Sequence, residues 1–405
     1  MEYSATLAYL HERLPMFSRI GKAAYRADLG NTHALMDLLG HPEQGLKCVH
    51  IAGTNGKGST ANMIASVLQE AGYRTGLHTS PHLRDFRERF RINGGMIPRE
   101  AVTAFVEQHR DTFEPIGASF FEWGVALVLD WFRREQSEIA VIECGLGGRL
   151  DSTNVITPEV SIITNIGWDH ADLLGDSLEK IAGEKAGIIK PGIPVVIGEA
   201  EGTIAEVFRR KAEEVGAPII FTDHTTPMHY ALDLAGAHQL RNAWTAMAAL
   251  KTLRGNGWNI TDAHIKAGLA QVCANTGFAG RWQTIAEIPR TIVDIGHNAD
   301  GLRVVNTMLA HSPHEHLHIV LGMVNDKDLA AMLALLPKHA TYYFCKADIP
   351  RGLEVDVLKG KAREQGLIGT AYPSVKIALA AAQEAAVAND LVLVTGSAFV
   401  VAEVV

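Results

Sequence analysis

A glycine-rich segment at residues 53–60, Gly-Thr-Asn-Gly-Lys-Gly-Ser-Thr, carries the clearest chemistry in the sequence. Glycines let backbone N–H groups turn toward phosphate oxygens, and a helix N-terminus behind them adds positive potential. Lys57 is placed to reach the β- and γ-phosphates of a nucleotide, and Ser59 or Thr60 to bind a magnesium ion. The spacing departs from G-x-x-x-x-G-K-[ST], because a glycine separates the lysine from the serine. An ordinary glycine turn is the alternative, but the order of strand, glycines, lysine, hydroxyls and helix favours a nucleotide-binding loop.

Three polar residues downstream stand at or near the ends of apolar runs. Glu143 ends one run and precedes three glycines, His170 follows another, and Lys185 lies in a short helical stretch. The carboxyl ends of parallel strands meet at one edge of a sheet, where ligands gather, and carboxylate oxygen suits magnesium. Each residue also has an ordinary explanation: a strand-end turn cap, a hydrogen-bonded loop histidine, or a solvated lysine.

The elements that would position these residues alternate between short apolar runs and longer helical stretches. Runs apolar on both faces are typical of parallel strands covered by helices. The pattern predicts a doubly wound α/β domain that carries the phosphate loop. Its predicted strands are residues 48–53, 138–145, 159–167 and 193–198, and its predicted helices include residues 59–72, 242–253 and 261–272.

A fresh series of strands indicates a second, smaller α/β domain of Rossmann-like character. Its predicted strands are residues 291–296, 317–324, 341–346 and 391–396. We place the domain boundary near residues 286–290, which predicts an ATP-binding domain at residues 1–287 and a C-terminal domain at residues 288–405.

Composition limits the classes of protein that the chain can belong to. Its 405 residues allow two or three domains of about 150 residues, and 47% apolar with 20% charged residues argues against disorder. No apolar run reaches the roughly 18 residues of a membrane-spanning helix, and the N-terminus lacks the pattern of a signal peptide. Four scattered cysteines fit a reducing cytoplasm better than a disulfide framework or a zinc site. A net charge of −8 without a basic run disfavours nucleic-acid binding.

The segment GTNGKGST resembles the phosphate loop of the Mur ligase superfamily, in particular that of folylpolyglutamate and dihydrofolate synthases. The resemblance implies that Glu143 and His170 bind Mg²⁺ and that Lys185 is carbamylated and helps to hold a second metal. A neutral amine that takes up carbon dioxide becomes a carboxylate, and thus an oxygen ligand. The implied ATP-binding residues of the loop are Thr54, Asn55, Gly56, Lys57, Gly58, Ser59 and Thr60, with Ser59 also a metal ligand and Lys57, His170 and Lys185 catalytic.

Two further stretches in the first domain resemble the same family. Residues 78–94 contain its TSPHL loop, in which Ser80 would contribute to the magnesium site. Residues 119–132 resemble the helix beside the pterin pocket, where Phe121 would stack on a flat ring; a core aromatic is an equally good explanation of Phe121. Asp151 would accept hydrogen bonds from the pterin, and Arg149 would help to hold the anionic folate.

The resemblance continues through the second half of the ATP site. Asn242, in GAHQLRNAWTA, would face the adenine, and Arg281, in AGRW, would contact phosphate. The family has proline where this chain has Ala279. Asp294 and His297, in DIGHNADG, are the remaining implied ATP contacts, with a glycine in place of the usual alanine. The segments GMVNDKD (322–328) and VTGSAF complete the match, which runs from about residue 18 to the C-terminus.

The resemblance implies an ATP-dependent amide ligase. The carboxylate of the acceptor attacks the γ-phosphate of ATP, and the amino group of L-glutamate then attacks the acyl phosphate. Dihydropteroate as acceptor would make the protein a dihydrofolate synthase, and tetrahydrofolate a folylpolyglutamate synthase. We expect both activities in a monomer, with synthesis of folylpolyglutamate alone as the alternative. Residues 17–42 match the family's N-terminal substrate loop only loosely and do not decide between the acceptors.

Three other functions remain as alternatives. A ligase that adds an amino acid to a UDP-muramyl acceptor carries an extra domain before the loop, and the 52 residues before Gly53 are too few for one. A non-catalytic nucleotide-binding switch would not need Glu143, His170 and Lys185 together. A Rossmann dehydrogenase is disfavoured because no G-x-G-x-x-G follows the first strand.

Overall fold

The structure is a computed structural model that describes residues 1–16, 19, 21, 26–325 and 329–405. The chain forms two compact units. The first comprises Met1–Asp233 with Ala237–Phe278, and the second Leu234–Gly236 with Ala279–Val405.

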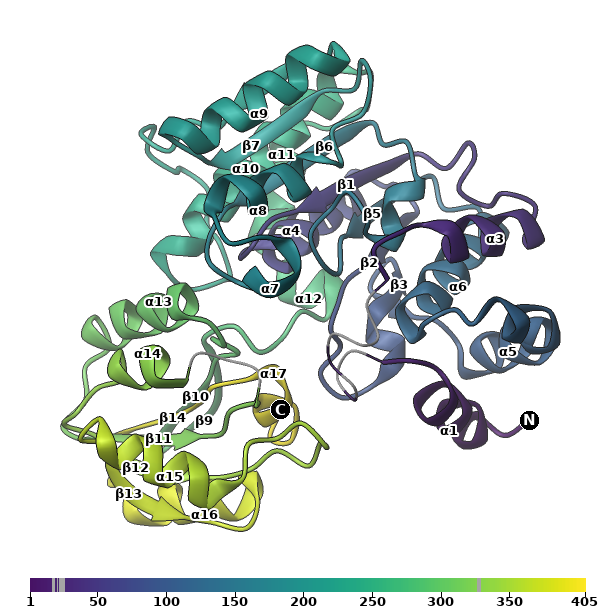
Figure 1. Cartoon of the computed structure of the whole chain (residues 1–405). Helices are drawn as coiled ribbons and strands as arrows, with labels where there is room; N and C mark the ends of the chain where they lie inside the picture. Colours follow the sequence, from purple (N-terminus) through teal and green to yellow (C-terminus); the bar gives the residue numbers. More distant parts are fainter. Residues whose placement is uncertain (17–18, 20, 22–25, 326–328) are drawn as a thin grey trace. The chain divides into compact units, whose positions relative to one another are not determined.

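The first unit is built on an eight-stranded sheet with the order β4-β3-β2-β5-β1-β6-β7-β8. Strand β1 (Cys48–Ala52) lies between β5 and β6 and is parallel to both, and all of its residues are buried. The sheet turns antiparallel only at β2, β3 and β4. Figure 1 shows helix α4 alongside β1 and β5. The other strands are β2 (Thr75–His78), β3 (Phe90–Ile92), β4 (Gly95–Met96), β5 (Ile139–Glu143), β6 (Val160–Asn165), β7 (Val195–Glu199) and β8 (Ile219–Phe221).

The helices of the first unit begin at recognisable signals. Helix α6 (Phe120–Arg134) starts with a capping box, in which the side chains of Ser119 and Glu122 each accept from the other's backbone N–H. Helix α4 (Lys57–Glu70) instead starts after Gly56, which has a left-handed φ of 83° that glycine adopts without strain. The remaining helices are α1 (Tyr3–Arg13), α3 (Gly30–Leu38), η2 (Phe86–Arg89), α5 (Arg99–Phe113), η3 (Glu114–Ile116), η4 (Ser152–Val155), α7 (Ala171–Leu174), α8 (Leu178–Ala186), α9 (Gly202–Val215), α10 (Ala237–Gly255), α11 (Asp262–Leu269) and α12 (Val272–Thr276).

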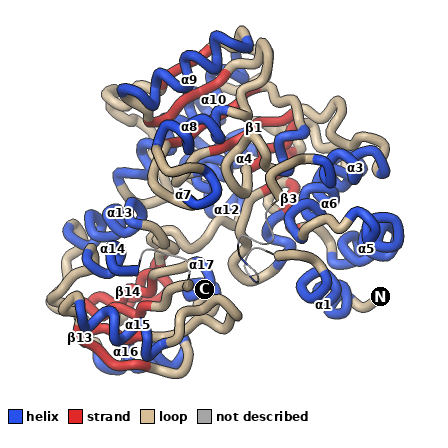
Figure 2. Tube along the Cα trace, in the orientation of Figure 1, coloured by secondary structure: helices blue, strands red, loops and turns tan. Residues whose placement is uncertain are grey.

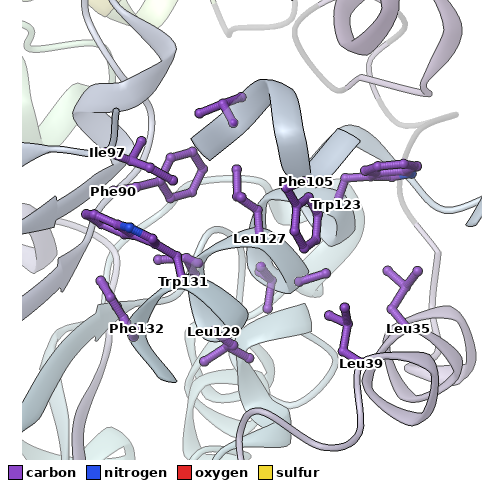
Figure 3. Close-up of a cluster of buried hydrophobic side chains, with 14 of the residues drawn as sticks. Leu35, Leu39, Phe90, Ile97, Phe105, Trp123, Leu127, Leu129, Trp131 and Phe132 are labelled. Atoms are coloured by element: carbon purple, nitrogen blue, oxygen red, sulfur yellow. The ribbon is translucent and has the colours of Figure 1, made fainter. Parts of the chain in front are cut away.

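Two hydrophobic clusters pack helices against one face of this sheet. The larger joins α1, α3, α5 and α6 to β5, and its aromatic side chains include Phe105 and Trp123, whose ring centroids lie 6.4 Å apart (Figure 3). The other joins α8 and α9 to β1, β6 and β7. Together they fix the loops that follow the carboxyl ends of these strands.

The second unit is built on a six-stranded sheet with the order β13-β12-β11-β14-β10-β9. All neighbours are parallel except β9 and β10, which form an antiparallel pair. Figure 2 shows these strands with helices alongside. The elements are β9 (Gln283–Glu287), β10 (Arg290–Val293), α13 (Ala299–Ala310), β11 (Leu317–Leu321), α14 (Leu329–Ala334), β12 (Thr341–Phe344), α15 (Val355–Glu364), β13 (Ile368–Ala371), α16 (Val375–Ala385), β14 (Leu391–Thr395) and α17 (Ala398–Ala402).

The predicted fold class, two α/β domains with mainly parallel sheets, is confirmed. All eight strands expected from apolar runs are present, shortened by up to three residues at an end. The structure divides the units between Phe278 and Ala279, nine residues before the division predicted from the sequence, because β9 pairs with β10. Strand β9 is half exposed and lacks the apolar pattern used to find the others. Among the described helices, none has the length and apolar character needed to cross a membrane.

Candidate nucleotide and acceptor site

The loop between β1 and α4 is shaped by two glycines. Gly53 has a φ of 148°, and a β-carbon there would lie 1.9 Å from Thr164 Oγ1. A β-carbon on Gly56 would lie 2.2 Å from Asn242 Oδ1. Both positions therefore require glycine, and the side chain of Asn242 lies against Gly56 of the phosphate loop.

The end of β6 holds this loop in place. Asn165 Oδ1 accepts from the backbone N–H of Asn55 at 2.9 Å, and Thr164 Oγ1 donates to the Asn55 carbonyl at 2.6 Å. The Thr54 hydroxyl donates to the carbonyl of Gly167 and accepts from its N–H. These bonds fix the loop backbone before any ligand arrives, which lowers the cost of ordering it around phosphate.

Two lysines share one carbonyl oxygen in the loop. Lys57 Nζ donates to the carbonyl of Gly53 at 3.1 Å and to that of Thr54 at 3.2 Å. Lys185 Nζ, from α8, donates to the same Gly53 carbonyl at 2.8 Å. The structure thus brings together two of the three predicted catalytic residues and concentrates positive charge beside the loop.

Lys185 lies in surroundings that disfavour its charge. Only 3% of the residue is exposed. Burial lowers the pKa of its ammonium to about 7, and the positive charge of Lys57 contributes in the same direction. The amine is therefore far more often neutral near pH 7 than that of a surface lysine.

The hydroxyl-bearing residues at the start of α4 are buried. Ser59 is 2% exposed and Thr60 is fully buried. No group among the described residues bonds to the Thr60 hydroxyl. A buried hydroxyl without a partner is unfavourable, and a ligand oxygen or a metal ion would satisfy it.

Glu143 and Ser80 lie together on the other side of the loop. Glu143 ends β5, is 4% exposed, and accepts from the Ser80 backbone N–H at 3.0 Å. A β-carbon on Gly58 would stand 3.6 Å from the Glu143 carboxylate. The predicted metal ligands Glu143 and Ser80 are thus neighbours, next to the first turn of α4.

His170 precedes the short helix α7 with a left-handed φ of 50°. Its Nε2 lies 3.9 Å from Asp169 Oδ1. Within the described part of the chain, no three His, Cys, Asp or Glu side chains are close enough to hold a metal. The predicted set contains only two such side chains, Glu143 and His170, and relies otherwise on serines and a modified lysine. Magnesium commonly keeps several waters and substrate phosphates among its ligands.

Three residues predicted for the acceptor lie around the loop that follows β5. The Phe121 ring lies over Gly145, where a β-carbon would approach it to 2.5 Å. Arg149 pairs with Glu184 at 2.8 Å and is largely exposed. Asp151 is 4% exposed and accepts from the backbone N–H groups of Leu146 and Thr153. Burial raises the pKa of the Asp151 carboxyl, and these hydrogen bonds oppose that rise.

In the second unit, Asp294 organises its own loop. Its carboxylate accepts from the backbone N–H of Trp282 at 2.9 Å and from that of Gly296 at 2.8 Å. Burial raises the pKa of this carboxyl, while the charge of Arg281 acts in the opposite direction. His297 Nδ1 lies 3.1 Å from the carbonyl oxygen of Ile295. The charges of Arg281 and His297 both act on the Asp294 carboxyl, so these three predicted residues lie close enough to interact electrostatically.

A pocket of about 490 Å³ opens at the carboxyl ends of β6, β7 and β8. Glu199 and Arg241, which line it, form an ion pair at 3.0 Å. Arg241 precedes Asn242, whose amide donates to Gln239 Oε1 at 3.0 Å. The pocket is therefore adjacent along α10 to the residue that approaches Gly56.

The sequence interpretation missed residues that support the loop. Thr164 and Asn165 hold Asn55, and the negative charge of Asp169 acts on Lys185. All three stand in TNIGWDH, at the end of a predicted strand, where polar residues at the ligand edge of a sheet could have drawn attention to them. Two resemblance segments fall partly outside the described residues: 17–42, at 17, 18, 20 and 22–25, and 322–328, at 326–328.

Comparison with known families matches both units. Residues 51–228 match the Mur ligase middle domain, and residues 280–398 match the glutamate ligase domain of Mur ligases.

Curated relatives are similar over nearly the whole chain. The dihydrofolate synthase/folylpolyglutamate synthase of Bacillus subtilis is 32% identical over 99% of this chain and 98% of its own length. A probable bifunctional folylpolyglutamate synthase/dihydropteroate synthase of Haloferax volcanii is 33% identical over 97% of this chain, which spans half the length of that relative.

Solved structures are also similar to this chain over nearly its whole length. Escherichia coli FolC in complex with DHPP and ADP has a TM-score of 0.87 and 32% identity, and the match covers 99% of this chain and 96% of that one. A bifunctional folylpolyglutamate synthase/dihydrofolate synthase with Mn, AMPPNP and L-glutamate bound has a TM-score of 0.84 and 30% identity, covering 99% and 97%. The chain therefore belongs to the Mur ligase family and, within it, to the folylpolyglutamate synthase/dihydrofolate synthase group.

Proposed function

We propose that this chain is an ATP-dependent ligase that joins L-glutamate to dihydropteroate and extends tetrahydrofolate with further glutamate. The observation that carries the proposal is the phosphate loop with two lysines on one carbonyl, together with the buried Glu143 carboxylate that accepts from the Ser80 N–H. The full-length similarity to synthases that bear both activities in their names supports it.

The reaction forms an amide through an acyl phosphate. A carboxylate oxygen of the acceptor attacks the γ-phosphorus, and the bond to the β,γ-bridging oxygen breaks to release ADP. The glutamate nitrogen then attacks the acyl carbon, phosphate leaves, and the amine proton passes to solvent. Lys57 and the loop N–H groups stabilise the charge on the transferring phosphoryl group.

The oxygen donors around the loop fit a divalent cation of the magnesium type. We propose Ser59, Ser80, Glu143 and His170 as protein ligands of Mg²⁺, with the modified side chain of Lys185 helping to hold a second metal ion. The buried Glu143 carboxylate and the unpartnered Thr60 hydroxyl support oxygen coordination here. Bound Mg²⁺ would neutralise phosphate charge, while the chain's own residues hold the loop and keep water away from the acyl phosphate.

Carbamylation of Lys185 is part of this proposal. The buried amine lies next to another cation, and conversion to a carbamate would replace that repulsion with attraction. Protein equilibrated with ¹³C-bicarbonate should show one protected carbamate signal in ¹³C NMR, and Lys185→Met should lack it. A wild-type spectrum without the signal in the presence of Mg²⁺ and ATP would contradict the modification.

The ATP contacts proposed outside the loop are Asn242, Arg281, Asp294 and His297. The pocket beside Arg241 has the volume of a small-ligand site and is our candidate for the nucleoside. Phe121, Asp151 and Arg149 are the proposed acceptor contacts. We also propose that the protein acts in the cytoplasm as a monomer, which light scattering coupled to size-exclusion chromatography can test.

The deciding experiment measures labelled glutamate joined to product by purified protein with ATP and Mg²⁺. Incorporation with both dihydropteroate and tetrahydrofolate is expected. Incorporation with tetrahydrofolate alone would leave a folylpolyglutamate synthase, and incorporation with a UDP-muramyl acceptor would indicate a cell-wall ligase. Glu143→Ala should abolish turnover while ATP binding persists, whereas a non-catalytic switch would show no turnover even in wild type.

A further inference from the structure

A buried polar network links the central strand of the first sheet to Asp151. His50, in the middle of β1, is fully buried, and its Nε2 lies 2.8 Å from Thr153 Oγ1. The Thr153 hydroxyl lies 2.5 Å from Asp151 Oδ1. The Sγ of Cys144 completes the group at 3.1 Å from His50 Nε2.

The network lies on a face of the sheet that also carries the buried polar side chains of Ser161 on β6 and His78 on β2. On β1, Cys48 and Ala52 point to the same side as His50, and both belong to hydrophobic clusters. A polar group in such a place costs free energy unless it is hydrogen-bonded. His50 of β1 is hydrogen-bonded to Thr153 of η4, which is hydrogen-bonded to Asp151 before η4, so the three buried side chains satisfy one another.

The chemistry of the groups fixes the direction of these hydrogen bonds. An ionised Asp151 can only accept, so the single proton of the Thr153 hydroxyl is donated to Oδ1. Thr153 Oγ1 must then accept from His50, which requires the tautomer with the proton on Nε2. His50 Nδ1 has no partner among the described residues, as suits a neutral ring whose second nitrogen is an idle acceptor.

The series leaves Asp151 with one oxygen suited to a ligand. Among the described residues, Oδ1 accepts from both the N–H and the hydroxyl of Thr153 and Oδ2 accepts from the N–H of Leu146, while the N–H of Gly145 acts on the carboxylate from outside hydrogen-bond geometry. A carboxylate has about four acceptor positions, so the remaining capacity lies on Oδ2. A single N–H donor of a bound heterocycle, rather than a pair, fits this arrangement.

We propose that His50 is a positioning residue that, through the Thr153 hydroxyl, orients Asp151 to accept a hydrogen bond from the N–H-bearing heterocycle of the acceptor. This rests on the proposed function, because it assigns Asp151 to the acceptor. Among the described residues, the side chains of His50 and Thr153 make hydrogen bonds to each other, to Asp151 and to Cys144, and none to the ATP loop or to a proposed metal ligand, so we expect their influence on acceptor binding.

Steady-state kinetics of matched variants test the proposal. Thr153→Val keeps the shape and removes the hydroxyl, and should raise KM for dihydropteroate about tenfold while KM for ATP and kcat change less than twofold or so. Thr153→Ser should restore wild-type behaviour. His50→Leu should act in the same direction more weakly, and His50→Gln, which keeps an N–H donor, should recover part of the loss.

The double variant His50→Leu/Thr153→Val distinguishes a series from two separate effects. If His50 acts through Thr153, the double variant should have the KM of Thr153→Val alone. Independent, multiplying effects would overturn the proposal, as would equal rises in KM for ATP and for dihydropteroate. Inactive wild-type protein would instead overturn the proposed function, so the two failures are distinguishable.

A measurement on the wild-type protein covers the case in which the variants do not fold. Burial lowers the pKa of His50 to about 3, so the ring stays neutral across the stable range. ¹⁵N NMR of labelled histidine should show one ring protonated on Nε2 that does not titrate between about pH 5 and 8. A neutral His50 protonated on Nδ1 would break the series and overturn the proposal.

Discussion

The two sheets of this protein end in loops with opposite hydrogen-bond polarity. After β1, carbonyl oxygens of the loop accept from the side chains of Lys57 and Lys185. After β10, the side chain of Asp294 accepts from the backbone N–H of Gly296 in that loop and from that of Trp282 before β9. The first arrangement places lysine charge on neutral carbonyls, whereas the second satisfies a buried negative charge with backbone N–H groups from two segments.

This difference separates two ways of building a site at the carboxyl edge of a parallel sheet. A lysine held only by carbonyls can move to a phosphate with little loss, because a charged partner is better than a neutral one. A carboxylate held by two N–H groups is expensive to move and serves to fix backbone geometry. We therefore expect the lysines to act on chemistry and Asp294 to act on binding.

The largest expected effect is that of Lys57→Met. The variant keeps the length of the side chain but removes the charge that stabilises the transferring phosphoryl group, so turnover should fall on the order of a thousandfold. Lys47→Met, at an exposed ion pair with Glu159, is the matched control and should be nearly silent. The measurement is the initial rate of glutamate incorporation. If Lys57→Met kept a tenth of wild-type activity, Lys57 would not stabilise the transferring phosphoryl group.

Lys185→Met should lower turnover by about a hundredfold, because a proposed metal ligand is lost. Lys180→Met, on the same helix but largely exposed, is its control and should retain full activity. Raising the Mg²⁺ concentration should recover little of the loss. Equal activities of the two variants would show that the buried lysine serves only the fold.

Asp294→Asn should raise KM for ATP about tenfold and leave kcat within a few-fold of wild type, because one N–H of the loop loses its acceptor. Asp300→Asn, at an exposed pair with Arg303, provides the comparison. A fall in kcat without a change in KM would reverse the roles that we assign to the two loops.

The smallest effect is a pH dependence of stability to which two buried histidines of the first unit contribute. The pKa values of His50 and His78 are lowered by burial to about 3 and about 4, against 6.5 for the unperturbed group. The unfolded chain therefore takes up protons below about pH 6.5 that the folded chain does not, and stability should fall as the pH drops from there toward about 4.

Thermal melting at several pH values measures this slope. His78→Phe preserves the stacking on Phe90, in which the ring centroids are 5.6 Å apart, and should flatten the dependence. His339→Phe, at an exposed position, should leave it unchanged. Identical slopes for both variants would show that another group controls acid stability.

The fold was largely predictable because buried parallel strands appear in the sequence as short apolar runs. Strands β1, β5, β6 and β7 are almost entirely buried and were all predicted. The half-exposed β9 and β13 carry no such run, since one face meets solvent and the pattern is diluted, and the apolar β8 is only three residues long. The length of a run also overstates its strand, because the last apolar residues turn into the ligand loops.

The residues of the candidate site could be predicted for a different reason than the strands. Lys57, Glu143 and Lys185 could be named from residue type, motif and strand ends, because those features are local in sequence. The bond from Lys185 to the Gly53 carbonyl joins residues 132 positions apart, and the one from His50 to Thr153 joins residues 103 apart. Such pairings depend on register between strands and loops, which a single sequence does not reveal.

The edge strands of the two sheets also affect how readily the protein self-associates at high concentration or on heating. The large sheet ends in β4, with two residues, and β8, with three, which leave few unpaired backbone groups for another chain. The small sheet has two edge strands, β9 and β13, and in β13 the apolar side chain of Ile368 is 78% exposed. We therefore expect β13 to contribute to self-association, and Ile368→Lys should delay aggregation without touching either ligand loop.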